Sequence, residues 1–116
     1  MPLNDAALDV MANALKGAAT YASLHSANPG TTGTSETTAA RQAIVWDGPT
    51  TGGDLSLQGT EAFTGGAASG AVTYVGLWSA VTGGTFYGGF ALTGDQAFNA
   101  AGEYTLTEVN LTATSS

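Results

Sequence analysis

The chain has 116 residues, a formal net charge of −7 and no cysteine. Lys16 and Arg41 are its only basic residues, and His25 is its only histidine. Two cations cannot form the basic patch that nucleic acid or anionic lipid requires, so we expect neither as a partner. No apolar stretch is long enough for a membrane-spanning helix, and without cysteine there is no disulfide or thiolate metal site. The length predicts one domain over residues 1–116.

The only helical pattern lies at the N-terminus. Leu8, Met11 and Leu15 recur at helical spacing, which predicts a helix over residues 4–16 with a narrow apolar stripe. A helix of that length is marginal in water when isolated, so its stripe must be covered. We expect the cover to be one end of the β-domain or a neighbouring subunit. The capping candidates are Asn4 or Asp5 at the start and Gly17 at the end.

Beyond Ala19 the hydrophobic period changes to two, which is typical of strands. The strongest strand covers residues 70–80 and is joined by a VTGG turn to the next one, so Trp78 and Phe90 are predicted to be core residues. Gly-Gly at 88–89 suggests a bulge there, and a phase change suggests another near Glu108. The predicted strands are 21–25, 41–47, 55–59, 60–64, 70–80, 85–92, 95–100 and 104–114, with a polar loop over 27–39.

Many short strands separated by glycine-rich turns predict a mainly β fold. The expected architecture is an antiparallel β-sandwich, jelly-roll-like, with one N-terminal α-helix. The absence of strand–helix alternation argues against a parallel α/β sheet.

The chain offers few residues for catalysis. Asp95, Glu103 and Glu108 could act as paired carboxylates, but their spacing does not indicate a pair, so we expect solvated surface charges. His25 has no second histidine or cysteine with which to hold zinc. It is expected to be a half-buried, hydrogen-bonding residue or part of a subunit contact.

Calcium is the remaining candidate metal ion. Glu36, Asp47 and Asp54 flank loops and carry oxygen ligands, but no calcium-loop motif is present. The Asn110 glycosylation triplet lies inside a predicted strand and is taken as a chance match. We therefore predict no catalytic, cofactor-binding or metal-binding residues, no cofactor and no enzyme activity.

Arg41 is the one basic residue of the β region. A single arginine among nine acidic residues is expected to pair with a carboxylate, because its planar guanidinium forms bidentate hydrogen bonds with carboxylates. Glu36 and Asp47 are near in sequence, and a partner on another strand is an equal alternative.

The amphipathic N-terminal segment and three later segments, in a fixed order, resemble small virion proteins of long-tailed bacteriophages, which are commonly labelled minor tail, tail-fibre or virion structural proteins. The three later segments carry the recognisable turn and strand motifs. They are SLHSANPGTTGTSE at 23–36, ARQAIVW at 40–46 and GLWSAVTGG at 76–84, and the resemblance covers nearly the whole chain. Ala39 departs from it, because relatives tend to have tyrosine there. The resemblance implies a β-rich subunit of the virion, assembled in the host bacterial cytoplasm and used in many copies.

The sequence leaves three functions to be compared for this chain. The first is a non-enzymatic structural protein, a minor tail or capsid decoration protein, that self-associates and docks on other virion proteins. Its shortage of lysine and glutamate suits interface cores. The second is a carbohydrate- or receptor-binding module at a tail tip, recognising a host surface glycan. The third, a small hydrolase, is disfavoured by the scattered acidic residues. If the chain had the second function, the aromatic rings that stack on the glycan would be those of Trp46, Trp78, Tyr21 and Tyr87.

Overall fold

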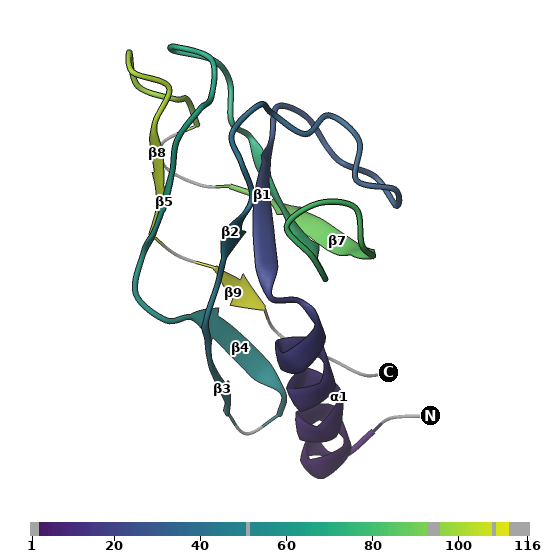
Figure 1. Cartoon of the computed structure of the whole chain (residues 1–116). Coiled ribbons are helices and arrows are strands. Elements are labelled where there is room, and N and C mark those ends of the chain that lie inside the picture. The colour runs from purple at the N-terminus through teal and green to yellow at the C-terminus, as the bar shows by residue number, and fades with distance from the viewer. Residues whose placement is uncertain (1–2, 51, 93–95, 108, 112–116) are drawn as a thin grey trace.

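The computed structural model describes residues 3–50, 52–92, 96–107 and 109–111. These form one helix and nine strands: α1 (Asp5–Ala18), β1 (Tyr21–His25), β2 (Gln42–Ala43), β3 (Trp46–Thr50), β4 (Asp54–Leu57), β5 (Glu61–Phe63), β6 (Tyr74–Trp78), β7 (Phe86–Ala91), β8 (Tyr104–Leu106) and β9 (Asn110–Leu111). The mainly β class with an N-terminal helix is confirmed (Figure 1). The strands make three antiparallel sheets, ordered β2-β1-β6-β7, β3-β4-β9 and β5-β8, so the term sandwich fits loosely.

Helix α1 lies against β3 and β4 of its own chain (Figure 1). Its start is capped by Asn4, whose side-chain oxygen accepts a hydrogen bond from the Ala7 N–H at 2.9 Å. Leu8 and Ala12 are buried, whereas Met11 is 56 % exposed. The side of the helix that faces the protein is therefore centred on Leu8 and Ala12, and the predicted stripe was wrong to include Met11. A neighbouring subunit is not needed to cover Leu8. None of the described helices is long and apolar enough to cross a membrane.

Two predicted strands are each divided between different sheets. The segment 41–47 forms β2, which pairs with β1, and then the start of β3, which pairs with β4. The segment 104–114 likewise contains β8, paired with β5, and β9, paired with β4. Unbroken alternation does not show where a chain leaves one sheet for another, so each was predicted as a single strand. The bulge expected at Glu108 lies outside the described residues.

The β6–β7 hairpin follows the prediction closely. Leu77 pairs with Gly88 and Trp78 pairs with Phe86, which leaves Tyr87 as the extra residue of a bulge. Trp78 is buried, as predicted, and Phe90 is half-buried and packs against the core.

One hydrophobic core joins the helix and all three sheets. Leu24 and Val75 contribute from the four-stranded sheet, Leu55 from the three-stranded sheet and Phe63 from the two-stranded sheet, and each is almost fully buried. Trp46 also belongs to the core, and its indole N–H donates to the Ala19 carbonyl oxygen at 2.8 Å just after α1. This bond joins the end of the helix to the first strand of the neighbouring sheet.

Candidate functional site

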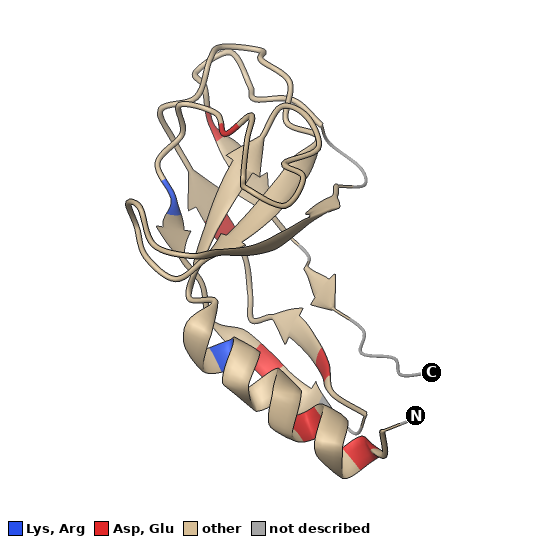
Figure 2. Cartoon of the chain, turned by 90° about the vertical axis from the view of Figure 1, so that its right-hand side faces the viewer, with Lys and Arg blue, Asp and Glu red and all other residues tan. Residues whose placement is uncertain are grey.

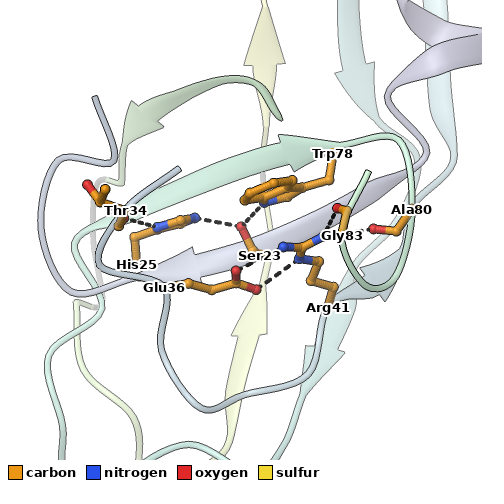
Figure 3. Close-up of polar contacts among 8 residues, drawn as sticks. All are labelled: Ser23, His25, Thr34, Glu36, Arg41, Trp78, Ala80 and Gly83. Atoms are coloured by element: carbon orange, nitrogen blue, oxygen red, sulfur yellow. Dashed lines mark hydrogen bonds and ion pairs between the residues drawn. The ribbon is translucent and has the colours of Figure 1, made fainter. Parts of the chain in front are cut away.

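A group of polar side chains lies on one face of β1 and β6 (Figure 3). Because side chains alternate along a strand, Ser23 and His25 point to the same face of β1. Trp78 comes from β6, the next strand of the sheet. Arg41 immediately precedes β2, and Glu36 lies in the loop between β1 and β2. We call Ser23, His25, Glu36, Arg41 and Trp78 the polar cluster.

A chain of hydrogen bonds fixes the imidazole of His25. Its Nδ1 lies 2.7 Å from the Thr34 carbonyl oxygen and its Nε2 lies 2.6 Å from Ser23 Oγ. A carbonyl oxygen only accepts, so Nδ1 carries the proton and Nε2 accepts from the serine hydroxyl. The Trp78 indole N–H in turn donates to Ser23 Oγ at 2.7 Å. One neutral tautomer therefore satisfies all three side chains.

Burial lowers the pKa of His25 below its ordinary value of 6.5, because the charged imidazolium is poorly solvated inside the protein. The hydrogen bond to Thr34 and the charge of Glu36 act in the opposite direction with less effect. His25 is therefore a neutral, hydrogen-bonded residue. The alternative placement in a subunit contact is wrong, since the side chain is fully buried within its own chain.

A serine hydroxyl beside an imidazole is the usual arrangement of a nucleophile and its base. Here neither Ser23 nor His25 has any exposed surface. Gly76 closes the space opposite them: a Cβ built there would lie 2.6 Å from His25 Nε2 and 2.8 Å from Ser23 Oγ. A substrate therefore has no access to this pair, and the arrangement serves to hold the strands and loop together.

Arg41 is paired, as predicted, and Glu36 is its carboxylate partner. The Nε donates to Oε2 at 2.9 Å and Nη2 donates to Oε1 at 3.0 Å. Nη1 donates to the carbonyl oxygens of Ala80 at 3.0 Å and Gly83 at 2.8 Å, in the turn between β6 and β7. The guanidinium also covers the Trp78 ring (Figure 3). One cation thus joins the β1–β2 loop to the β6–β7 turn.

The remaining acidic candidates are not brought together. Glu103 is exposed and accepts a hydrogen bond from the Asn99 side chain, while Asp95 and Glu108 lie outside the described residues. Within the described part of the chain, no three histidine or acidic side chains gather where they could hold a metal ion. The carboxylate of Glu36 is engaged by Arg41, while Asp47 and Asp54 lie on β3 and β4. Asn110 lies in β9, and the threonine of its triplet falls outside the described residues.

Three of the four rings suggested for stacking on a glycan are wholly or partly covered. Trp46 and Trp78 are buried and Tyr21 is half-buried, whereas Tyr87 is 43 % exposed. The two tryptophans also use their indole N–H groups inside the protein. Their role is in the fold, because both rings are buried and both indole N–H groups bind acceptors of the same chain.

Among the described residues, two cavities are present that the sequence did not predict. One of about 320 Å³ lies beside β5 and β8, where the polar side chains of Asn99 and Glu103 already bond to each other. The other is an apolar groove of about 270 Å³ between α1 and β4. The helical pattern contained a signal for it, because all three residues of the predicted apolar stripe, Leu8, Met11 and Leu15, line the groove. The groove is lined by Leu8, Met11, Ala12, Leu15, Gly53, Leu55 and Leu111.

A protein-family model described as Podophage GP4 fiber I protein gp80 matches residues 3–114. The chain belongs to this family. The resemblance to phage virion proteins is thereby confirmed at the level of a fibre-type phage protein, but the assignment to long-tailed phages is wrong, since podophages are short-tailed. The segments that carried the resemblance are turn and strand motifs, which do not encode tail length. No curated protein and no solved structure matches the chain.

Proposed function

We propose that this chain is a non-enzymatic structural subunit of a podophage fibre, present in the virion and associated with copies of itself and with other virion proteins. The match of residues 3–114 to the gp80 fibre family supports this proposal most strongly. A fibre position is preferred to the minor tail and capsid decoration alternatives because the matching family is described by its fibre.

The polar cluster supports a structural role. Its serine and histidine are buried and bond to each other, and its arginine donates four hydrogen bonds to protein acceptors. Such a network rigidifies a fold, and the burial of Ser23 and His25 keeps this pair away from a substrate. A subunit that must keep its shape within a particle benefits from this rigidity.

The distribution of charge supports association with other proteins. Residues 62–94 contain no charged residue, although the chain as a whole carries −7. In Figure 2 several charged positions gather on and beside the helix, whereas most of the remaining ribbon is uncharged. Charged residues are depleted in the cores of protein interfaces, so this composition suits a subunit that packs against neighbours.

Immunogold labelling of purified virions tests the proposed function. An epitope tag carried by the virion protein should place gold particles on the fibres. Gold on the capsid surface would contradict the fibre position and support decoration. Virions that lack the protein altogether, as judged by both labelling and mass spectrometry, would overturn the proposal.

A further inference from the structure

The imidazole of His25 is covered on one side by a single loop. This covering loop, residues 26–36, follows β1 and leads toward β2 (Figure 3). Its Thr34 carbonyl oxygen lies 2.7 Å from Nδ1 of His25. A Cβ built on Gly33 would lie 2.5 Å from the Trp78 ring, so the backbone of the loop packs directly on the polar cluster.

The covering loop has few anchors. All of its residues are described, and only Pro29 among them is buried, where it lies against β7. The other attachments to the fold are polar. The Ser26 carbonyl oxygen accepts from the Thr73 hydroxyl at 2.9 Å, and Glu36 pairs with Arg41. A segment that buries so little apolar surface opens at a lower free energy than the whole fold.

The other sides of His25 are closed by the four-stranded sheet. Strand β1 lies between β2 and β6, and the neighbouring Leu24 has no exposed surface and belongs to the hydrophobic core. Gly76 of β6 leaves no room beside the ring, as described above. Water could enter from these sides only if the sheet came apart. The covering loop is therefore the part of the fold whose displacement hydrates His25 at the lowest cost.

A second proton on the imidazole would disturb the polar cluster. Because Nδ1 already donates to Thr34, the proton would be added at Nε2, which accepts the hydroxyl hydrogen of Ser23 in the neutral form. Ser23 would lose this acceptor, and its oxygen would face two N–H donors, from His25 and Trp78. The charged ring would also remain without water while the loop is closed.

The charges around the ring do not compensate for its burial. Burial is the largest influence on the pKa of His25 and lowers it below 6.5. Glu36 of the loop favours the imidazolium with less effect, and Arg41 before β2 opposes it. Tyr74 of β6 pairs with His25, and a phenol is uncharged at neutral and acidic pH. From β7 the ring of Phe86 lies 6.3 Å away and carries no charge.

We propose that the covering loop opens locally when His25 takes up a second proton, so that acidification uncovers the polar cluster while the three sheets remain folded. In the open form the hydrated imidazole has its ordinary pKa of about 6.5, so it binds the proton more readily than in the closed form. The ratio of open to closed molecules should therefore rise by up to about 30-fold at pH 5. This inference goes beyond the proposed function and does not depend on it.

Hydrogen exchange of the full-length protein, followed by NMR at pH 7 and pH 5, tests the proposal. The probes are the amides of Ser26, which donates to the Ser35 carbonyl oxygen, and Thr34, which donates to that of Pro29. After correction for the intrinsic exchange rates, their protection should fall about tenfold or more at pH 5. The reference is the Leu57 amide of β4, which donates to the Val109 carbonyl oxygen outside the loop.

Low concentrations of urea distinguish local opening from unfolding. Protection of Ser26 and Thr34 should be independent of urea, because little surface is exposed, whereas protection of Leu57 should fall with urea. An equal urea dependence of the loop and reference amides, or loop protection that is the same at both pH values, would overturn the proposal.

His25→Gln is the matched variant, because His25 is the only histidine and the substitution removes its titration. The protection of Ser26 and Thr34 should then change less than about twofold between pH 7 and pH 5. A pH effect in this variant as large as in the wild type would assign the opening to another group and overturn the proposal. If the variant does not fold, the urea dependence of the wild-type amides still decides between a local and a global opening.

Discussion

The guanidinium carbon of Arg41 lies 3.6 Å from the centroid of the Trp78 ring. A cation over an indole at this distance is attracted by the electron density of the ring, and the attraction is strongest where water is excluded. The Arg41 side chain is only 9 % exposed, and its nitrogen atoms bind Glu36 and the β6–β7 turn. The Arg41 side chain therefore ties the β1–β2 loop to the β6–β7 turn.

Replacing Arg41 by lysine should lower the free energy of unfolding by about 1–3 kcal/mol, since an ammonium keeps the charge but cannot bind Glu36, Ala80 and Gly83 together. The midpoint of urea unfolding measures the change. The matched control is Lys16→Arg, which retains a donor for the Gly48 carbonyl and should shift stability by less than about 0.5 kcal/mol. An unchanged midpoint in Arg41→Lys would show that the planar guanidinium is not required.

Truncating Trp78 should be far more costly. Trp78→Ala removes a buried ring that also packs against Phe86 at a centroid distance of 5.0 Å, and we expect a loss of about 3–5 kcal/mol. Trp78→Phe keeps most of the ring but removes the bond to Ser23, so it should cost less than Trp78→Ala. Tyr87→Ala, at an exposed position on the same hairpin, is the control. Equal effects of Trp78→Ala and Tyr87→Ala in urea unfolding would contradict the burial of the indole.

Local structure was easier to predict from the sequence than the arrangement of the strands in sheets. The helix, the β6–β7 hairpin and its bulge depend on neighbouring residues, so spacing and glycine pairs were sufficient to predict them. The split of 41–47 into β2 and β3 was not predictable in this way. Whether Gln42 or Trp46 pairs with β1 depends on where two distant strands lie, and alternation is the same in both cases.

Gly76 should tolerate no side chain. Gly76→Ala would place a Cβ against His25 Nε2 and Ser23 Oγ, so the polar cluster would have to shift, and we expect a clear loss of stability in urea unfolding. Gly17→Ala is the matched control, because nothing lies within 4 Å of the added carbon. Alanine in a helix should stabilise the protein by about 0.5–1 kcal/mol. A Gly76→Ala variant as stable as the wild type would show that this space is not filled.

The neutral state of His25 predicts a dependence of stability on pH. Burial holds the pKa of the folded imidazole below the unfolded value of 6.5, so the unfolded chain binds the proton more readily. Stability should therefore be constant above pH 6.5 and fall as the pH is lowered through and below 6.5. Urea unfolding at several pH values, down to about 5 where carboxylates begin to titrate, measures this slope.

His25→Gln is the comparison for that slope, because it removes the titrating group and keeps a polar side chain. The variant should be less stable than the wild type at neutral pH but should lose little further stability between pH 6.5 and about 5. The same slope in both proteins, or a wild type that gains stability on acidification, would contradict a buried neutral imidazole.

The polar cluster was predicted only in part. An arginine among nine acidic residues had to be paired, and Glu36 was close enough in sequence to be named as a partner. Nothing in the spacing of Ser23 and His25 indicated that Trp78, more than fifty residues away, would donate a hydrogen bond to the serine. Such contacts depend on strand pairing, which a single sequence does not specify.

The two sides of α1 should respond differently to truncation in the monomer. Leu8→Ala would open a cavity beside β4, because Leu8 is buried and its backbone lies against Gly53, so we expect a loss of about 2–5 kcal/mol. Met11→Ala shortens an exposed side chain and should change stability by less than about 0.5 kcal/mol. Urea unfolding at dilute protein concentration, where any dimer has dissociated, measures both. A large effect of Met11→Ala under those conditions would mean that Met11 supports the fold of its own chain despite its exposure.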